Sequence, residues 1–403
     1  MVSGAEQSPA LPRIRAYPLK ERAWRNWQTR LPRSKSGFGC AGSHDDFERI
    51  KLQATGCERS RAKPGSATNS GPILEQAGVA ELANATGLGP VGRKPLEVRV
   101  LSPAFALGVL LLAASAHASV ELKSVSWQAA TPLPLARTEV TAARLGGEIV
   151  VVGGYVADGT STGRVDAYSP RSGRWRRLPN LPAQVNHAMA ASAGGRVYVV
   201  GGYGAERRAF VFFGGRWRAL RKLPAPRAAA GAAVVGRKLY VVGGVVAPGR
   251  LAARMLVLDL RSGRWSYAPG PSPREHLAVT AAGGILYALA GRSGGTNFTT
   301  FESYSPKRRT WRRLPAVPYP RGGTGATVVG GRVVSVGGEE AAGTIPSVYA
   351  YDIRGRRWAR LPDMRTPRHG LGVVAFGSSV YAIAGGPQPG LHVSAANEFL
   401  TLP

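Results

Sequence analysis

Short apolar segments that end in glycine recur from about residue 119 to the end of the chain. The clearest copies are IVVVGG (149–154), VYVVGG (197–202), LYVVGG (239–244) and VVSVGG (333–338), with weaker copies at 286–291 and 380–386. Each apolar run is only four or five residues long, which is typical of a buried strand and too short for an ordinary helix. The pattern therefore predicts an all-β fold.

Each repeat unit contains four such strands, as the second unit illustrates. We predict strand a with its turn in HAMAASAGG (187–195), strand b in RVYVVGG (196–202), strand c in RAFVFFGG (208–215) and strand d in RWRAL (216–220). Glycine pairs end strand b because the backbone turns sharply there, where a side chain would clash.

A tryptophan recurs near the start of each strand d, at steps of 42 to 48 residues. The six are Trp127, Trp175, Trp217, Trp265, Trp311 and Trp358. A period in the forties with short strands predicts a β-propeller, with the indoles packed between neighbouring blades. The last unit has no tryptophan strand of its own, whereas the strand around Trp127 stands alone at the start. We therefore predict six four-stranded blades, closed by an N-terminal strand that completes the last blade and removes the exposed sheet edges.

The unit resembles the kelch repeat in its glycine pair, in a tyrosine of strand c and in the tryptophan that follows. The tyrosines are Tyr168, Tyr304 and Tyr351. The resemblance covers six units over about 285 residues, with departures at Ala290-Gly291 and Phe212-Phe213. It implies a kelch-type propeller, a fold that usually binds ligands on the face formed by the b–c and d–a loops.

The first 118 residues do not share the repeat. Residues 1–103 have no regular hydrophobic period, and parts of them resemble peptides translated from tandem transfer-RNA genes, so we expect a disordered extension or a stretch that is not translated. The segment AFALGVLLLAASAHA (104–118) ends in an A-x-A pattern and is too short to span a bilayer, which favours a signal peptide over a buried strand or helix. We expect cleavage near Ala118 and a secreted, periplasmic or cell-surface propeller over 119–403.

Charge adds one surface to this picture. The chain has a formal net charge of +30 at pH 7, although a GC-rich coding sequence also produces many arginines. Arginine and lysine residues in the c–d and a–b turns should form a basic annulus on one face, which an anionic cell-surface polymer would fit. Specific nucleic-acid binding is not expected, because no aromatic side chains that could stack on nucleobases lie among these basic residues.

An arginine recurs ten residues after most tryptophans. The set is Arg137, Arg227, Arg321 and Arg368, with Arg274 one residue early, and unit two has Val185 there with His187 nearby. Because strand a lines the central channel, we expect these side chains at the channel mouth. Two interpretations remain: the arginines capture a carboxylate, or they bond to backbone carbonyls of the adjacent blade.

The b–c loops complete the candidate ligand-binding set. They vary in length and chemistry, as loops that set specificity do. Their first residues include Tyr155, Tyr203, Arg292 and Glu339. Glu339 and Glu340 are adjacent in an extended segment and point opposite ways, so they make a poor acid–base pair.

Metal and cofactor chemistry is not predicted. His276 and His369 stand beside the recurring arginines, but the sequence shows no cluster of His, Asp and Glu around them. Both cysteines, Cys40 and Cys57, precede the repeats. A copper radical oxidase, which needs a Cys-linked tyrosine, is therefore excluded.

Two functions fit these observations. The first is a non-catalytic, exported binding protein that holds an anionic protein segment or a glycan on the loop face. The alternative is a carbohydrate-active propeller enzyme that resembles a sialic-acid mutarotase. It would place the arginines on the sugar carboxylate and use His187 or Glu339 for proton transfer. A third function, that of an intracellular adaptor, is not favoured, because we identify no partner domain in the sequence and because the segment 104–118 favours export.

Overall fold

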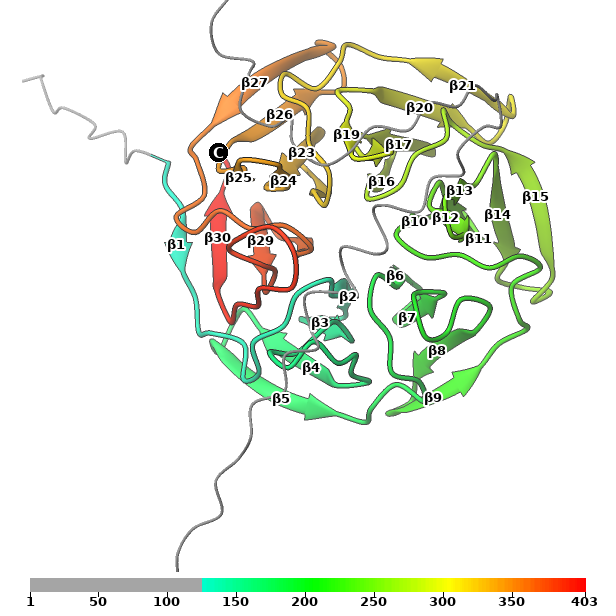
Figure 1. Cartoon of the computed structure of the whole chain (residues 1–403), viewed down its shortest axis with the longest axis horizontal. Helices are drawn as coiled ribbons and strands as arrows, with labels where there is room; N and C mark the ends of the chain where they lie inside the picture. Colours follow the sequence, from blue (N-terminus) through cyan, green and yellow to red (C-terminus); the bar gives the residue numbers. More distant parts are fainter. Residues whose placement is uncertain (1–124) are drawn as a thin grey trace, which may run out of the picture. The chain divides into compact units, whose positions relative to one another are not determined.

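The computed structural model describes residues 125–403, which form six antiparallel four-stranded sheets arranged as blades around a centre (Figure 1). The predicted extension (1–103) and the predicted signal segment (104–118) both lie outside the described residues. Within 125–403, no helix is long and apolar enough to cross a membrane. The predicted six-bladed, all-β propeller is confirmed.

Each blade runs from strand a at the centre to strand d at the rim (Figure 1). The strands of blade one are β2 (Thr141–Leu145), β3 (Glu148–Val152), β4 (Val165–Ser169) and β5 (Arg174–Leu178). Those of blade two are β6 (Met189–Ala193), β7 (Arg196–Val200), β8 (Ala209–Phe213) and β9 (Arg216–Ala219). Those of blade three are β10 (Gly231–Val235), β11 (Lys238–Val242), β14 (Arg254–Asp259) and β15 (Trp265–Pro269).

The remaining blades repeat this order. Blade four contains β16 (Ala278–Ala282), β17 (Ile285–Leu289), β20 (Phe301–Ser305) and β21 (Thr310–Arg313). Blade five contains β22 (Gly325–Val329), β23 (Arg332–Val336), β26 (Val348–Asp352) and β27 (Arg357–Leu361). Blade six contains β28 (Gly372–Phe376), β29 (Ser379–Ile383), β30 (Asn397–Thr401) and β1 (Gln128–Ala129).

Strand β1 closes the ring as predicted. Gln128 lies opposite Phe399 and Ala129 opposite Glu398, so the first described strand is the outer strand of the last blade. The adjoining Trp127 is 4 % exposed. Closure therefore rests on a short strand and one buried indole.

The core is divided among the interfaces between blades. Buried apolar side chains of 125–403 form six clusters, each shared by two neighbouring blades. Val150 and Val152 of blade one, for example, pack with Val197 and Val199 of blade two. Because each sheet is covered on both faces, strand b is apolar at successive positions, which explains the uninterrupted runs in the sequence.

The tryptophans tie each blade to the one before it. The Nε1 atom of each donates to a backbone carbonyl at or just after strand d of the preceding blade, at 2.8 to 2.9 Å. The donor and acceptor pairs are Trp127 and Pro362, Trp175 and Thr131, Trp217 and Pro179, Trp265 and Arg221, Trp311 and Pro269, and Trp358 and Pro315. The predicted packing between blades is confirmed, and the indole N–H adds a directional bond to it.

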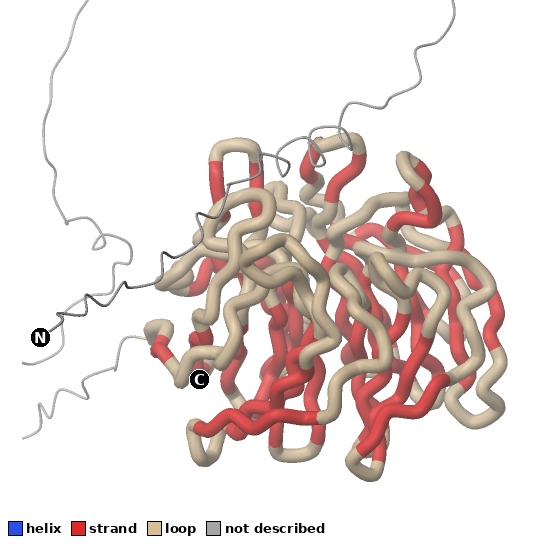
Figure 2. The backbone as a smooth tube through the Cα atoms, turned by 60° about the horizontal axis from the view of Figure 1, so that its bottom comes forward, coloured by secondary structure: helices blue, strands red, loops and turns tan. Residues whose placement is uncertain are grey.

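Three of the b–c loops form small hairpins. They are β12 (Val245–Ala247) with β13 (Arg250–Leu251), β18 (Arg292–Ser293) with β19 (Thr296–Asn297), and β24 (Glu339–Glu340) with β25 (Gly343–Thr344). Figure 2 shows such hairpins, in red, projecting from one side of the disc. We call this side, which carries the b–c and d–a loops, the loop face. The opposite side, which carries the a–b and c–d turns, is the turn face.

Candidate functional site

A ring of six equivalent residues surrounds the channel, one in each link that leads into strand a. All six have a positive φ of 50 to 64° and line the channel. They are Glu139, His187, Ala229, His276, Gly323 and Gly370. The amide of each donates to the carbonyl of its counterpart in the preceding blade at 2.8 to 3.1 Å, except that Val140 rather than Glu139 closes the ring onto Gly370. Backbone bonds thus set six equivalent side-chain positions around the channel.

The glycine pairs form a second ring of bonds between blades. In each blade, the amide of one glycine after strand b donates to the carbonyl at the recurring arginine position of the next blade, at 2.8 to 2.9 Å. The donors are Gly154, Gly202, Gly244, Gly291, Gly338 and Gly385. A Cβ atom on Gly154 would lie 2.5 Å from the carbonyl oxygen of Thr138, so no other residue fits without a shift. These bonds aim the residue that follows each pair toward the channel mouth.

A cavity of about 260 Å³ lies at the mouth of the channel on the loop face. Its lining residues are Glu139, Tyr155, His187, Tyr203, His276, Arg292, Glu339, His369, Gly390 and Leu391. Five of the ten predicted ligand-binding residues therefore come together here: Tyr155, His187, Tyr203, Arg292 and Glu339. Every blade except the third contributes to the lining.

The five recurring arginines lie elsewhere. Their side chains are 0 to 2 % exposed, and each extends inside its own blade toward carbonyl groups at the ends of strands b and c. Arg137 donates to the carbonyl oxygens of Gly153 and Arg164 at 3.0 and 2.8 Å, and to Asp166 at 2.7 Å. These are the bonds of a structural cation that holds strand ends together.

The other blades vary this arrangement. Arg274 pairs with Glu302 at 2.5 Å and Arg368 with Glu398 at 3.4 Å, whereas Arg321 bonds to the carbonyl and hydroxyl of Ser347. Arg227 makes one bond, to the carbonyl of Arg254 at 2.9 Å. The prediction that these arginines crowd the channel mouth is wrong. The alternative, bonding to carbonyl groups, is correct in kind, but the carbonyls belong to the same blade.

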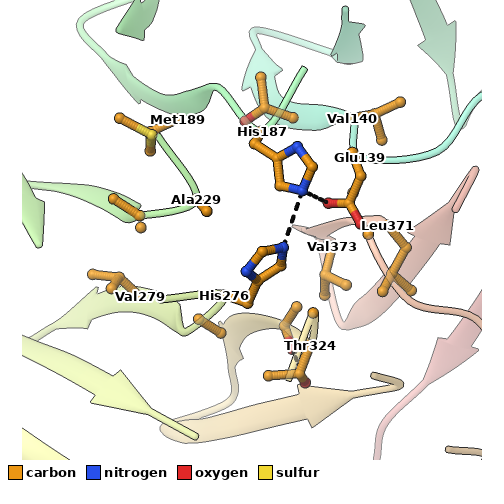
Figure 3. Close-up of a pocket in the computed structure, with 18 of the residues that line it drawn as sticks. Glu139, Val140, His187, Met189, Ala229, His276, Val279, Thr324, Leu371 and Val373 are labelled. Carbon is orange, nitrogen blue, oxygen red and sulfur yellow. Dashed lines mark hydrogen bonds and ion pairs between the residues drawn. The ribbon is translucent and has the colours of Figure 1, made fainter. Parts of the chain in front are cut away.

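Three side chains of the inner ring, Glu139, His187 and His276, line both the channel and the cavity, and Figure 3 shows them together in the channel. The Nε2 atom of His187 lies 3.2 Å from Oε2 of Glu139 and 3.0 Å from Nε2 of His276. One donor atom of each residue lies within 4.8 Å of the other two. The expectation that no His, Asp and Glu cluster exists is therefore wrong: blades one, two and four supply one.

Outer partners fix these three side chains. Nδ1 of His187 lies 2.5 Å from Oδ1 of Asn186, and Nδ1 of His276 lies 3.1 Å from Oε2 of Glu275. The second carboxylate oxygen of Glu139, Oε1, lies 3.1 Å from Nδ1 of His369.

Burial and charge set the ionisation of the cluster. Burial raises the pKa of Glu139, but His187 and His369 lower it more, so this pKa is held well below its ordinary range. Burial lowers the pKa of His187 to about 4 despite the nearby Glu139. Burial also lowers the pKa of His369, yet the hydrogen bond and charge of Glu139 raise it further, and the net shift is upward. At neutral pH the carboxylate is ionised and His187 is neutral.

Arg292 links two further carboxylates to the cluster. Its Nε lies 3.1 Å from Glu275, its Nη1 2.6 Å from Glu339 and its Nη2 3.3 Å from Nε2 of His276. Counted without the imidazoles, the three carboxylates (Glu139, Glu275 and Glu339) and the one guanidinium carry a formal charge of −2. The site is thus acidic in a strongly basic chain.

Sequence reasoning missed Glu139 and Glu275 and left His276 and His369 outside the site. A signal for part of the cluster is present in the repeats. Glu139 and His276 each stand two residues after a recurring arginine, and His187 stands at the corresponding place in unit two. Aligning the units on that position would have shown three ligand-type side chains in one ring.

Comparison with known families agrees with the structure. The model described as the KLHDC2/KLHL20/DRC7 Kelch-repeats domain matches residues 215–386, and the Kelch motif model matches residues 136–182. No curated protein matches the chain. The matched regions cover blade one and extend from the end of blade two into blade six. Together with the glycine pairs, the tryptophan bonds and the closed ring of six blades, these matches show that the chain is a kelch-repeat β-propeller protein.

Proposed function

We propose that this protein is an exported, non-catalytic binding protein that receives part of a protein or glycan ligand in the loop-face cavity. One observation carries the proposal: side chains from five blades converge on a single cavity of about 260 Å³. Kelch propellers typically act as binding scaffolds. A concave site with a few converging polar groups is the usual form of a ligand site.

The lining indicates the chemistry of the ligand. Glu139 and Glu339 offer hydrogen-bond acceptors, Arg292 and the hydroxyl of Tyr203 offer donors, and Leu391 gives an apolar rim. Such a mixture suits the hydroxyl and amide groups of a glycan or a peptide. The anionic ligand expected from the sequence relied on arginines that are buried, so a negative ligand group would need another cation in the cavity.

A mutarotase-like enzyme is supported less well. Such an enzyme would hold a sugar carboxylate on arginines at the channel mouth. Within 125–403, the one arginine that lines the cavity is Arg292, and it is already bonded to Glu275 and Glu339. Export remains part of the proposal on the strength of the segment 104–118.

The turn face is a second candidate surface, for an anionic cell-surface polymer. The basic side chains of the c–d turns are exposed, and none of them forms an ion pair with another described residue. They include Arg171, Arg174, Arg216, Arg264, Arg308 and Arg356. A ring of unpaired surface cations attracts polyanions in a salt-dependent manner.

The two faces can be separated with one pair of variants. The full chain, Leu391→Trp and Arg216→Glu are each applied to arrays of glycans and peptides. Leu391 is 42 % exposed, so a larger side chain obstructs the cavity without disturbing the core. Leu391→Trp should weaken binding at least tenfold while Arg216→Glu leaves it unchanged. The reverse result would assign binding to the turn face, and an unaffected signal in both variants would refute the cavity as the binding site.

A further inference from the structure

Three donor atoms converge at the floor of the cavity at distances that suit a bound ion. Two ligands held by one zinc-sized ion at about 2.1 Å lie about 3.0 to 3.4 Å apart. The separations here are 3.2 Å between Glu139 Oε2 and His187 Nε2, and 3.0 Å between the Nε2 atoms of His187 and His276. The remaining pair lies within 4.8 Å. For all three atoms to bind one ion, the Glu139 and His276 side chains must therefore move closer together, while His187 is already at a suitable distance from both.

The outer partners orient both imidazoles for coordination. Asn186 donates from Nδ2 to Ser161 at 2.7 Å, so its Oδ1 accepts from Nδ1–H of His187. Glu275 likewise faces Nδ1 of His276. With its proton on Nδ1, each imidazole turns the lone pair of Nε2 inward. A carbonyl or carboxylate behind a ligating histidine is the arrangement found at protein metal sites.

Electrostatics favours a cation at this point. Two lone pairs and an ionised carboxylate oxygen face one another, which is repulsive unless positive charge lies between them. Glu139, Glu275, Glu339 and Arg292 together carry −2. Two described groups can compete with a bound cation. Arg292 lies 3.3 Å from Nε2 of His276, and its Nε and Nη1 are already held by carboxylates. His369 lies 3.1 Å from Oε1 of Glu139, the carboxylate oxygen that points away from His187.

These three side chains are not required by the ring that presents them. The equivalent residue is Ala229 in blade three, Gly323 in blade five and Gly370 in blade six, and the same backbone bonds form there. The fold thus accepts a position with no functional side chain. A glutamate and two histidines at three of the six equivalent positions are therefore not needed to form the ring itself.

We propose that Glu139, His187 and His276 bind a divalent transition-metal ion. Imidazole nitrogen and carboxylate oxygen suit Zn²⁺ and Fe²⁺, and two histidines with one carboxylate leave further coordination positions open. The three residues line both the channel and the loop-face cavity, so an open position faces the cavity. This inference deepens the proposed function and rests on its cavity: the ion takes an oxygen atom of the ligand, such as a carboxylate or a sugar hydroxyl.

The test is a titration of the full chain, without a polyhistidine tag and after removal of metals with EDTA, with Zn²⁺ and separately with Co²⁺. His187→Ala and His276→Gly copy the residues found in other blades, and Glu139→Gln keeps the shape of the side chain. His392→Ala, an exposed histidine of the β29–β30 loop, is the matched control. Calorimetry gives stoichiometry and affinity, and the visible spectrum of Co²⁺ reports its ligands.

We expect one ion per wild-type chain, at least a 100-fold loss of affinity in each of the three ligand variants, and no change in His392→Ala. Glu275→Gln should weaken binding about 10- to 100-fold, because it removes the partner of His276. Melting temperatures of the metal-free variants close to that of the metal-free wild type would show that the variants fold.

Absence of binding to the wild type, or binding that survives in both histidine variants, would overturn the proposal. Metal affinity is measured on the protein alone, so a bound ion without any array ligand would leave this inference standing while the proposed function fails.

Discussion

The Nε2 atoms of His187 and His276 lie 3.0 Å apart although 89 positions separate the residues in the chain. They belong to blades two and four, and Ala229 of blade three occupies the equivalent place between them. Because Ala229 carries only a methyl group, the two imidazoles meet across it (Figure 3). The cluster therefore depends on which blades have a small residue in the inner ring as well as on which have a ligand-type side chain.

The glycine pairs provide a test of the contacts between blades. A Cβ atom on Gly201 would lie 2.3 Å from the carbonyl oxygen of Arg227, whereas one on Gly214 would meet open space, and the two have similar φ of +61° and +59°. We expect Gly214→Ala to lower the free energy of unfolding by about 1 kcal/mol, because alanine is strained in the left-handed backbone conformation. Gly201→Ala should lower it by at least about 3 kcal/mol, because the clash with the carbonyl oxygen is added to that strain. Chemical denaturation measures both, and equal costs would argue against this role of the glycine pair.

The recurring arginines should differ in their contributions to stability. Arg274 pairs with the buried Glu302, but in blade three Leu256 occupies the corresponding position of strand c, and Nε and Nη1 of Arg227 are buried without a partner. Arg274→Met should cost about 3 to 5 kcal/mol because it leaves an unpaired buried carboxylate.

Arg227→Met should change stability by no more than about 1 kcal/mol, since it removes a poorly compensated buried charge. Denaturant unfolding of both variants and of the wild type measures these differences in the free energy of unfolding. A cost for Arg227→Met as large as that for Arg274→Met would mean that the guanidinium of blade three is better bonded than its contacts indicate.

Ring closure should depend on Trp127. Trp127→Phe removes the bond to Pro362 but keeps an aromatic ring, and should cost about 1 kcal/mol. Trp127→Ala also empties the space between the blades, and should cost about 3 to 5 kcal/mol. Trp217→Phe, which loses the same bond inside the ring, is the control for the first change. Equal stabilities of the two Trp127 variants would show that the indole does not hold the closing strand.

The proposed signal segment, 104–118, leads to a prediction about the mature protein. Cleavage after Ala118 should give a chain that starts at Ser119, because Ala116-His117-Ala118 follows an apolar run of about 15 residues. N-terminal sequencing of protein from the culture fluid and from the cells of the native host measures this start. Protein found only inside cells, with residues before 104 intact, would contradict export.

The order of the strands, the number of blades and the closing strand follow from local patterns. The same pattern repeats along the chain: four short strands, a glycine pair after strand b and a tryptophan near strand d. An error in assigning the strands of one unit is therefore corrected by comparison with the other units. The missing last tryptophan and the isolated Trp127 then imply closure. Residues that begin the b–c loops, such as Tyr203 and Glu339, were predictable as site residues because loops that leave strand b must share one face.

Tertiary structure determined where the side chains of the recurring arginines and of the inner ring point. Spacing places Arg137 near the channel mouth, but whether its side chain points into the channel or back into the blade depends on the carbonyls of Gly153 and Arg164, which the folded blade brings within reach. The cluster at the floor of the cavity needs Glu139, His187 and His276 to face a common centre. No local pattern encodes that meeting, because it exists only when six blades close around one axis.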